Sequence, residues 1–134
     1  MASSQQLYQE YKSLLQKIAD VKYATAVLQW DQETYLPAKG STIRGRQIAT
    51  LSEIAHQQFT DEGTGELLQQ LITREDLADS EKRNVQLSLE DYTKNKKLSS
   101  DFVRKMAETV NRSFHAWVQA RKENSFTVFQ QPLD

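Results

Sequence analysis

The sequence predicts an all-α protein, an up-and-down array of about five helices of which the first is long. Its 134 residues are enough for one domain. Glycine occurs only four times and proline twice, and residues 66–131 contain neither. Strands joined by tight hairpins need such turn residues at short intervals, so this long run excludes a small all-β fold. Apolar residues at helical spacing fill much of the same run.

The first predicted helix covers about residues 4–33. Ser3 or Ser4 provides a hydroxyl that can cap its start. Pro37 disfavours helical geometry at the residue before it, so the helix is expected to end near Thr34. Steps of three and four residues place one stripe on one face of this helix: Leu7, Tyr11, Leu14, Ile18, Val21, Thr25 and Leu28.

The remaining helices are predicted from their caps and their apolar spacing. The second helix is expected to have Ser41 or Thr42 as its N-cap, the third Thr64, and the fifth Ser99 or Ser100. The second to fifth helices are expected at about residues 42–59, 64–74, 80–97 and 99–123. The fourth helix is expected to point Val85, Leu89 and Tyr92 inward. The fifth carries one stripe: Phe102, Met106, Val110, Phe114 and Trp117.

The tail, residues 125–134, is more apolar than chain ends normally are. It contains Phe126, Val128, Phe129 and Leu133, with Pro132 placed as if to start another helix. Two interpretations stay open. The tail either folds back over the helices, or it leads into a downstream part of a larger protein. The second fits a core that is expected to be thin, since only 38% of the residues are apolar and the mean hydropathy is −0.69.

Composition excludes several classes of protein. The absence of cysteine excludes disulfides and thiolate metal sites. A net charge of −1 and the acidic residues around the basic cluster argue against nucleic-acid binding, and no stretch is apolar enough for a membrane span. We therefore expect a soluble, cytoplasmic protein. The basic cluster is interpreted as a solvated helix end: Lys94, Lys96, Lys97, Arg104 and Lys105.

No catalytic or metal site can be assembled from the residue types present. The glycines do not match a phosphate-binding loop, and neither histidine belongs to a nucleophile or HExxH pattern. Glu53 and His56 have the Glu-x-x-His spacing of di-metal helix bundles, but Arg112 stands where His115 would need a matching glutamate. We expect no catalytic residue, no metal and no cofactor in this segment.

Residues 30–37 are the densest in special side chains. Asp31 and Glu33 are two residues apart at a helix end, which makes a poor metal pair. Trp30 is expected to be a large core anchor, with Asp31 or Glu33 paired to Arg44 or Arg46 across the turn. Such a pair would fix the angle between the first two helices; the alternative is contact with a ligand or with another part of a larger protein.

This segment also carries a resemblance. Five parts of the sequence resemble the N-terminal region of the thermostable (Taq-type) zinc carboxypeptidases. They are Trp-Asp-Gln-Glu-Thr-Tyr-Leu-Pro at 30–37, Arg44, Ile-Ala-Thr-Leu-Ser-Glu-Ile-Ala-His at 48–56, the 117–121 stretch and Ser-Phe-Thr-Val-Phe-Gln-Gln-Pro-Leu at 125–133. Leu36, where methionine is usual, and Gln131 depart from that pattern. The positions that match the family signature are Trp30, Asp31, Glu33, Thr34, Pro37, Arg44, Leu51, His56, Trp117 and Arg121.

The resemblance implies the N-terminal part of a longer peptidase that removes C-terminal residues from peptides. In such enzymes the zinc ligands and the catalytic HExxH helix lie downstream, and these first helices form a wall or lid of the substrate groove. The implied partners are the downstream catalytic portion and a peptide substrate, and the parent is expected to be a homodimer. The alternative, from another class, is a free-standing helical module that binds a partner or itself, because the stripe of the first helix has a spacing that suits helix pairing.

Overall fold

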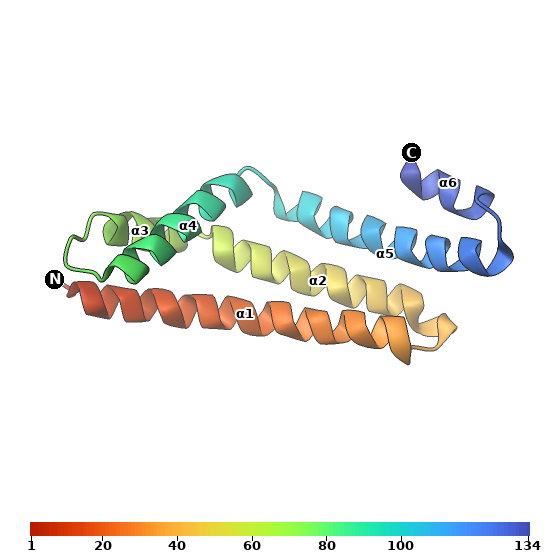
Figure 1. Cartoon of the computed structure of the whole chain (residues 1–134), viewed down its shortest axis with the longest axis horizontal. Helices are drawn as coiled ribbons and strands as arrows, with labels where there is room; N and C mark the ends of the chain where they lie inside the picture. The colour runs from red at the N-terminus through yellow and green to blue at the C-terminus, as the bar shows by residue number, and fades with distance from the viewer.

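The chain is all-α, as expected, and has one helix more than the sequence predicts. The computed structural model describes residues 1–134 and contains no strand (Figure 1). The additional helix lies in the tail. The elements are α1 (Ser4–Thr34), the 3₁₀ turn η1 (Ala38–Gly40), α2 (Ser41–Thr60), α3 (Glu62–Ile72), α4 (Asp79–Asn95), α5 (Ser100–Glu123) and α6 (Thr127–Leu133). No helix combines the length and apolar character needed to cross a bilayer.

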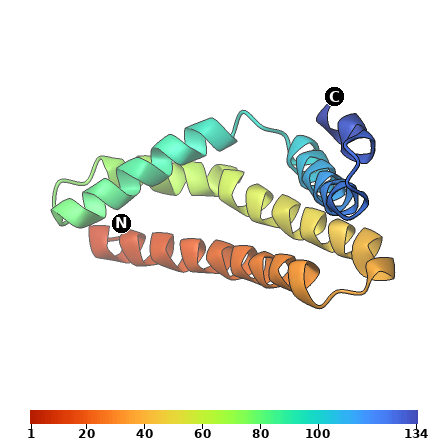
Figure 2. The same cartoon turned by 45° about the vertical axis from the view of Figure 1, so that its right-hand side comes forward.

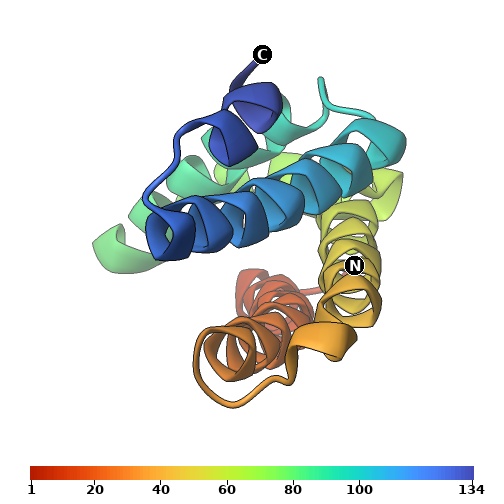
Figure 3. The ribbon, with the colours of Figure 1, turned by 90° about the vertical axis from the view of Figure 1, so that its right-hand side faces the viewer.

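The helices form an elongated array with two ends. α1 and α2 run antiparallel along its length, and α3 and α4 cover the N-terminal end of α1 (Figure 1). α5 returns along α2 toward the opposite end but crosses the α1–α2 pair obliquely (Figures 2 and 3). α6 folds back on the side of α5 that faces away from α2 (Figure 1).

The buried core is small, and its main cluster lies at one end. Only 19 of the 134 residues are buried, so most apolar side chains keep some solvent contact. The main apolar cluster joins the start of α1 to α3, α4 and the turn between them: Leu7, Tyr8, Tyr11, Leu67, Leu68, Leu71, Leu77 and Val85. Leu89 and Tyr92 pack against it, so the inward face predicted for the fourth helix is confirmed. The other half contains the end of α1, the start of α2, α5 and α6, and its buried apolar residues are few, Ile48 and Ala49 of α2 among them.

Two predicted caps are confirmed and two are wrong. Ser3 caps α1 by accepting from the Gln6 N–H at 3.2 Å, and Ser99 caps α5 by accepting from the Phe102 N–H at 3.1 Å. Neither Ser41 nor Thr42 caps α2, because the 3₁₀ turn leads directly into it and both residues are already helical. For α3 the cap is Asp61, whose carboxylate accepts from the Gly63 N–H at 2.9 Å.

The third helix therefore begins earlier than predicted, at Glu62. Thr64 lies inside it and donates its hydroxyl to the Gln58 carbonyl at 3.0 Å instead of capping. At the other end of the array, α5 ends at Asn124, which adopts the left-handed conformation with φ 51°. Asparagine tolerates this geometry better than most residues, and it turns the chain back toward α6.

Candidate functional site at the corner of the first two helices

Arg44 locks the end of α1 to the start of α2. Its Nη1 donates to the Asp31 carboxylate at 2.7 Å and to the Leu28 carbonyl at 3.0 Å, and its Nε donates to the Gln47 side chain at 3.1 Å. The Arg44 and Asp31 side chains are 15% and 34% exposed, so water screens this ion pair only partly. Of the pairings that the sequence left open, Asp31 with Arg44 is the one that forms.

Trp30 is not a core anchor, contrary to the prediction. It is 58% exposed and packs edge-on against Tyr35, with ring centroids 5.7 Å apart. At the C-terminal end of α1 the face that carries Trp30 has no helix over it, so size and apolarity alone did not decide its burial. Thr34 donates its hydroxyl to the Trp30 carbonyl at 2.8 Å, and Glu33 is exposed without an ion-pair partner. Pro37 precedes the 3₁₀ turn in an extended conformation.

A buried polar junction lies next to this corner, and the sequence analysis did not find it. The Asn111 side chain of α5 is buried and donates to the Gln32 side chain of α1 at 2.6 Å. It also lies against Gly45 of α2, where an added Cβ would be 2.6 Å from the Asn111 Oδ1. Three helices thus meet at one amide. A glycine inside one predicted helix and an asparagine inside another were the available signals.

His56 holds α2 to the turn between α4 and α5. Its ring is buried, and Nε2 donates to the Leu98 carbonyl at 2.9 Å. Glu53, one turn earlier, lies 3.8 Å from the Arg104 guanidinium. Zinc ligation needs an imidazole nitrogen that is free to face the metal, together with further histidines or carboxylates. No group of three or more such side chains is arranged to hold a metal, so the residues of this chain do not fit a zinc ion.

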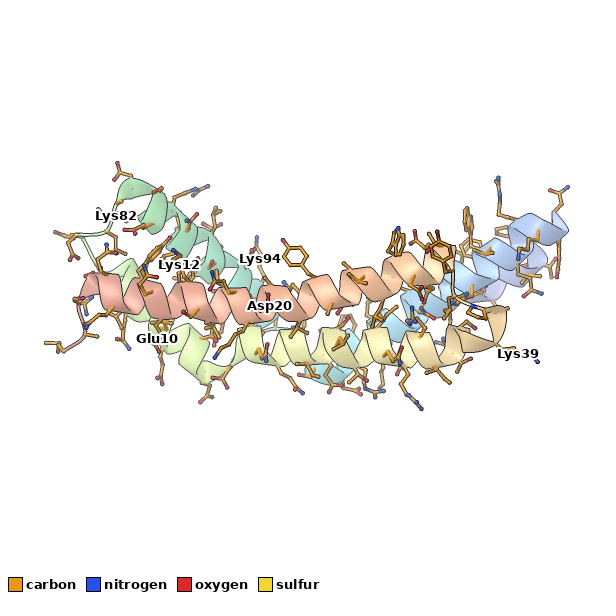
Figure 4. The ribbon with its side chains drawn as sticks, turned by 90° about the horizontal axis from the view of Figure 1, so that it is seen from below. Glu10, Lys12, Asp20, Lys39, Lys82 and Lys94 are labelled. Atoms are coloured by element: carbon orange, nitrogen blue, oxygen red, sulfur yellow. The ribbon has the colours of Figure 1, made fainter.

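The basic cluster is held mainly by neighbouring oxygens. Lys96 donates to the Thr60 carbonyl at 2.9 Å. Arg104 contacts Asp101 and Glu108 at 3.0 Å, and Lys105 contacts Asp101 at 2.7 Å. The hydrogen bonds from Lys105 and Arg104 keep the pKa of the Asp101 carboxyl below its usual value. Elsewhere, charged residues are dispersed over α1, α4 and the 3₁₀ turn, as Figure 4 shows for Lys12, Lys82 and Lys39.

Trp117 and Arg121 lie near the end of α5, away from the Arg44 ion pair in sequence and on another helix. The Trp117 ring stacks on Phe114, with centroids 6.5 Å apart, and Arg121 lies over the Trp117 ring at 5.8 Å. Leu51 is half-buried in the middle of α2. The structure thus gathers Trp30, Asp31, Thr34 and Arg44 at one corner, and keeps Leu51, His56, Trp117 and Arg121 on separate parts of α2 and α5.

The comparisons with known proteins confirm the family resemblance. The carboxypeptidase Taq (M32) metallopeptidase family matches residues 10–134, nearly the whole chain. This chain belongs to the M32 family. Among curated members it is 29% identical to Carboxypeptidase 1 of Bacillus subtilis over 126 residues, which cover 93% of this chain and 25% of that protein. It is 27% identical to Thermostable carboxypeptidase 1 of Thermus thermophilus, covering 89% of this chain and 24% of that protein.

Solved M32 structures contain the same arrangement of helices. The chain superposes on the BsuCP crystal structure with a TM-score of 0.91 at 28% identity, and on the M32 carboxypeptidase of Deinococcus radiodurans with a TM-score of 0.74 at 35% identity. Each superposition covers 95% of this chain and 26% of the other. The chain therefore spans about a quarter of the length of the M32 relatives that it matches.

Proposed function

We propose that this chain is the N-terminal groove-wall portion of a zinc-dependent carboxypeptidase that removes C-terminal residues from peptides. The observation that carries the proposal is the M32 match over residues 10–134, combined with a length about a quarter of that of the relatives. Since no residues here fit zinc, the metal and the hydrolytic step belong to the downstream portion, and the chain alone is inactive. We also propose that the full-length protein is cytoplasmic and homodimeric. The absence of cysteine supports the cytoplasmic location.

The downstream portion is proposed to cover an apolar surface on α5. Four large side chains follow one another there at helical spacing, each 46–60% exposed: Phe102, Met106, Val110 and Trp117, hereafter the α5 stripe. Single exposed apolar residues are ordinary, but a continuous row along a helix marks a contact surface. The missing three quarters of the M32 fold supply an occupant of sufficient size.

A second exposed surface is proposed to face the substrate groove. Tyr23, Val27 and Trp30 of α1 lie on one helix face and are 58–72% exposed. The Arg44–Asp31 ion pair and the Asn111 junction fix the α1 end that carries Trp30, so the wall is rigid where the aromatic rings are presented. Rigid aromatic surfaces suit peptide binding because few side-chain rotamers are lost on contact.

The test replaces the first quarter of the Bacillus subtilis Carboxypeptidase 1 with this chain. The fusion is expected to release C-terminal residues from peptides and to lose this activity with a zinc chelator, whereas the chain alone and the truncated remainder are inactive. Met106→Asp together with Val110→Asp is expected to abolish activity of the fusion, with Leu87→Asp on α4 as the control. Activity of the chain alone would overturn the proposal, and a fusion no better than the truncated remainder would support the free-standing, non-catalytic module instead.

The proposed contact of α1 with the substrate can be tested separately, by measuring KM in the same fusion. Trp30→Ala should raise KM several-fold while the melting temperature stays unchanged, because the ring is exposed and makes one aromatic contact. An unchanged KM would remove Trp30 from the groove.

A further inference from the structure

A polar cavity of about 510 Å³ lies between the start of α2 and the second half of α5. No apolar side chain lines it, which is unusual because ligand pockets are mostly apolar with a few polar groups. Figure 1 shows these two segments side by side, at the end of the molecule opposite the α3–α4 pair. Apart from Gly45 the lining residues are polar or charged, and such side chains suit a hydrated or charged occupant.

The charged groups in the lining are predominantly positive. Arg46 and Arg112 both line the cavity, and neither has a carboxylate within 4.0 Å. Glu108 is the one acidic residue in the lining, and its carboxylate is engaged by Arg104 at 3.0 Å. Two guanidinium groups without anionic partners, facing one cavity from two helices, are the arrangement that binds oxyanions.

Polar hydrogen-bonding groups complete the lining. The Ser41 and Thr42 hydroxyls belong to the first turn of α2, whose dipole favours an anion, and no side chain caps this turn. His115 lines the cavity from α5, and its Nε2 is the one buried side-chain nitrogen or oxygen in the chain with no hydrogen-bond partner. That nitrogen has almost no accessible surface, so the His115 ring meets the cavity through its other atoms.

We propose that this cavity binds a tetrahedral oxyanion, the phosphate group of a small polar ligand. Arg46 and Arg112 would donate to the phosphate oxygens from α2 and α5, with the Ser41 and Thr42 hydroxyls as further donors. The guanidinium fork matches a phosphate, and the donors come from both sides of the cavity. Its volume leaves room for a group larger than inorganic phosphate. The site needs neither zinc nor the downstream portion, so it stands apart from the proposed peptidase function.

The test titrates inorganic phosphate into the 134-residue chain by calorimetry at constant ionic strength, because added salt screens exposed charges. One phosphate per chain is expected, with shifts of the His115 ring resonances in a parallel NMR titration. Arg46→Gln and Arg112→Gln should each weaken binding about tenfold, as the loss of one charge-assisted hydrogen bond does. Both side chains are exposed, so unchanged circular dichroism is expected for both variants.

The matched control is Arg83→Gln on α4. Arg83 is also exposed and donates to a residue three positions away on its own helix, Gln86 at 3.1 Å, as Arg112 does to Thr109 at 3.3 Å. This control should bind phosphate like the unmodified chain, sulfate should compete, and acetate should not. Absence of saturable binding, equal weakening by Arg83→Gln, or acetate binding as tight as phosphate would each overturn the proposal.

Discussion

Asp31 and Arg44 show how one ion pair can hold two helices together. The guanidinium is mostly shielded from water and has three hydrogen bonds, two of them to the last turns of α1. Removing the carboxylate leaves a shielded positive charge without its counterion, which costs more than the loss of a surface pair. The pair therefore acts on the fold first, and on any groove through the fold.

Asp31→Ala is expected to lower the free energy of unfolding of the chain by about 2 kcal/mol, the scale of a hydrogen bond to a charged group. Urea denaturation followed by circular dichroism measures this. Glu33→Ala is the matched control, since Glu33 is exposed, makes no ion pair and should change stability by less than about 0.5 kcal/mol. Equal effects of the two substitutions would mean that Asp31 serves something other than the α1–α2 corner.

At the scale of elements, α5 shows what the spacing of apolar residues can predict about a helix and what it cannot. The predicted stripe exists, yet Phe102, Met106, Val110 and Trp117 are exposed, and only its fifth member, Phe114, is half-buried. The face that packs on the rest of the chain is displaced by one residue, to Val103, Ala107 and Asn111, and one residue corresponds to about 100° around a helix. Periodicity identifies an amphipathic helix, but the neighbour that covers each face is a tertiary property. Here the largest residues lie on the face without a neighbour.

The caps lead to the same conclusion from the helix ends. Ser3 and Ser99 could be predicted because each is the side chain that accepts from the free N–H groups at its helix start. At α3, Asp61 and Thr64 compete, and the local geometry gives Asp61 the cap while Thr64 bonds to the last turn of α2. Side-chain type limits the candidates for a cap, and the loop conformation chooses among them.

Replacing Gly45 tests the junction at which α1, α2 and α5 meet around Asn111. Alanine normally stabilises a helix by about 0.5–1 kcal/mol relative to glycine, but at this position its Cβ would be 2.6 Å from the Asn111 Oδ1. The amide cannot swing away freely because it donates to Gln32. Gly45→Ala is therefore expected to destabilise the chain by about 1–3 kcal/mol in urea denaturation, against the helix propensity.

The same measurement has a control and a rescue. Gly63→Ala changes a glycine whose added Cβ would meet only the exposed Asp61 carboxylate, at 3.0 Å, so it should be neutral or stabilising. Asn111→Ala removes the obstruction, and the double variant Gly45→Ala with Asn111→Ala should cost less than the sum of the two single changes. Additive costs would show that the two residues are not coupled and that α2 and α5 separate instead.

In the whole molecule, the main cluster of buried residues lies at one end. Such an uneven distribution is expected of a chain that is much shorter than its M32 relatives. The main core cluster sits between the start of α1 and the α3–α4 pair. The other half presents the α5 stripe, together with Phe126 and Leu133 of α6. An M32 chain about four times longer has the material to cover this half, whereas these residues alone leave it open to water.

The open half predicts how the isolated chain behaves in solution. Apolar surface exposed along one helix favours association, so the 134-residue chain is expected to self-associate in a concentration-dependent way in sedimentation velocity experiments. Met106→Glu together with Val110→Glu should make it monomeric, because it places charges in the middle of the α5 stripe. Leu87→Glu is the control, since Leu87 is 43% exposed but lies on α4, outside the stripe. A chain that stays monomeric at high concentration, or that Leu87→Glu dissociates equally well, would show that the α5 stripe does not drive self-association.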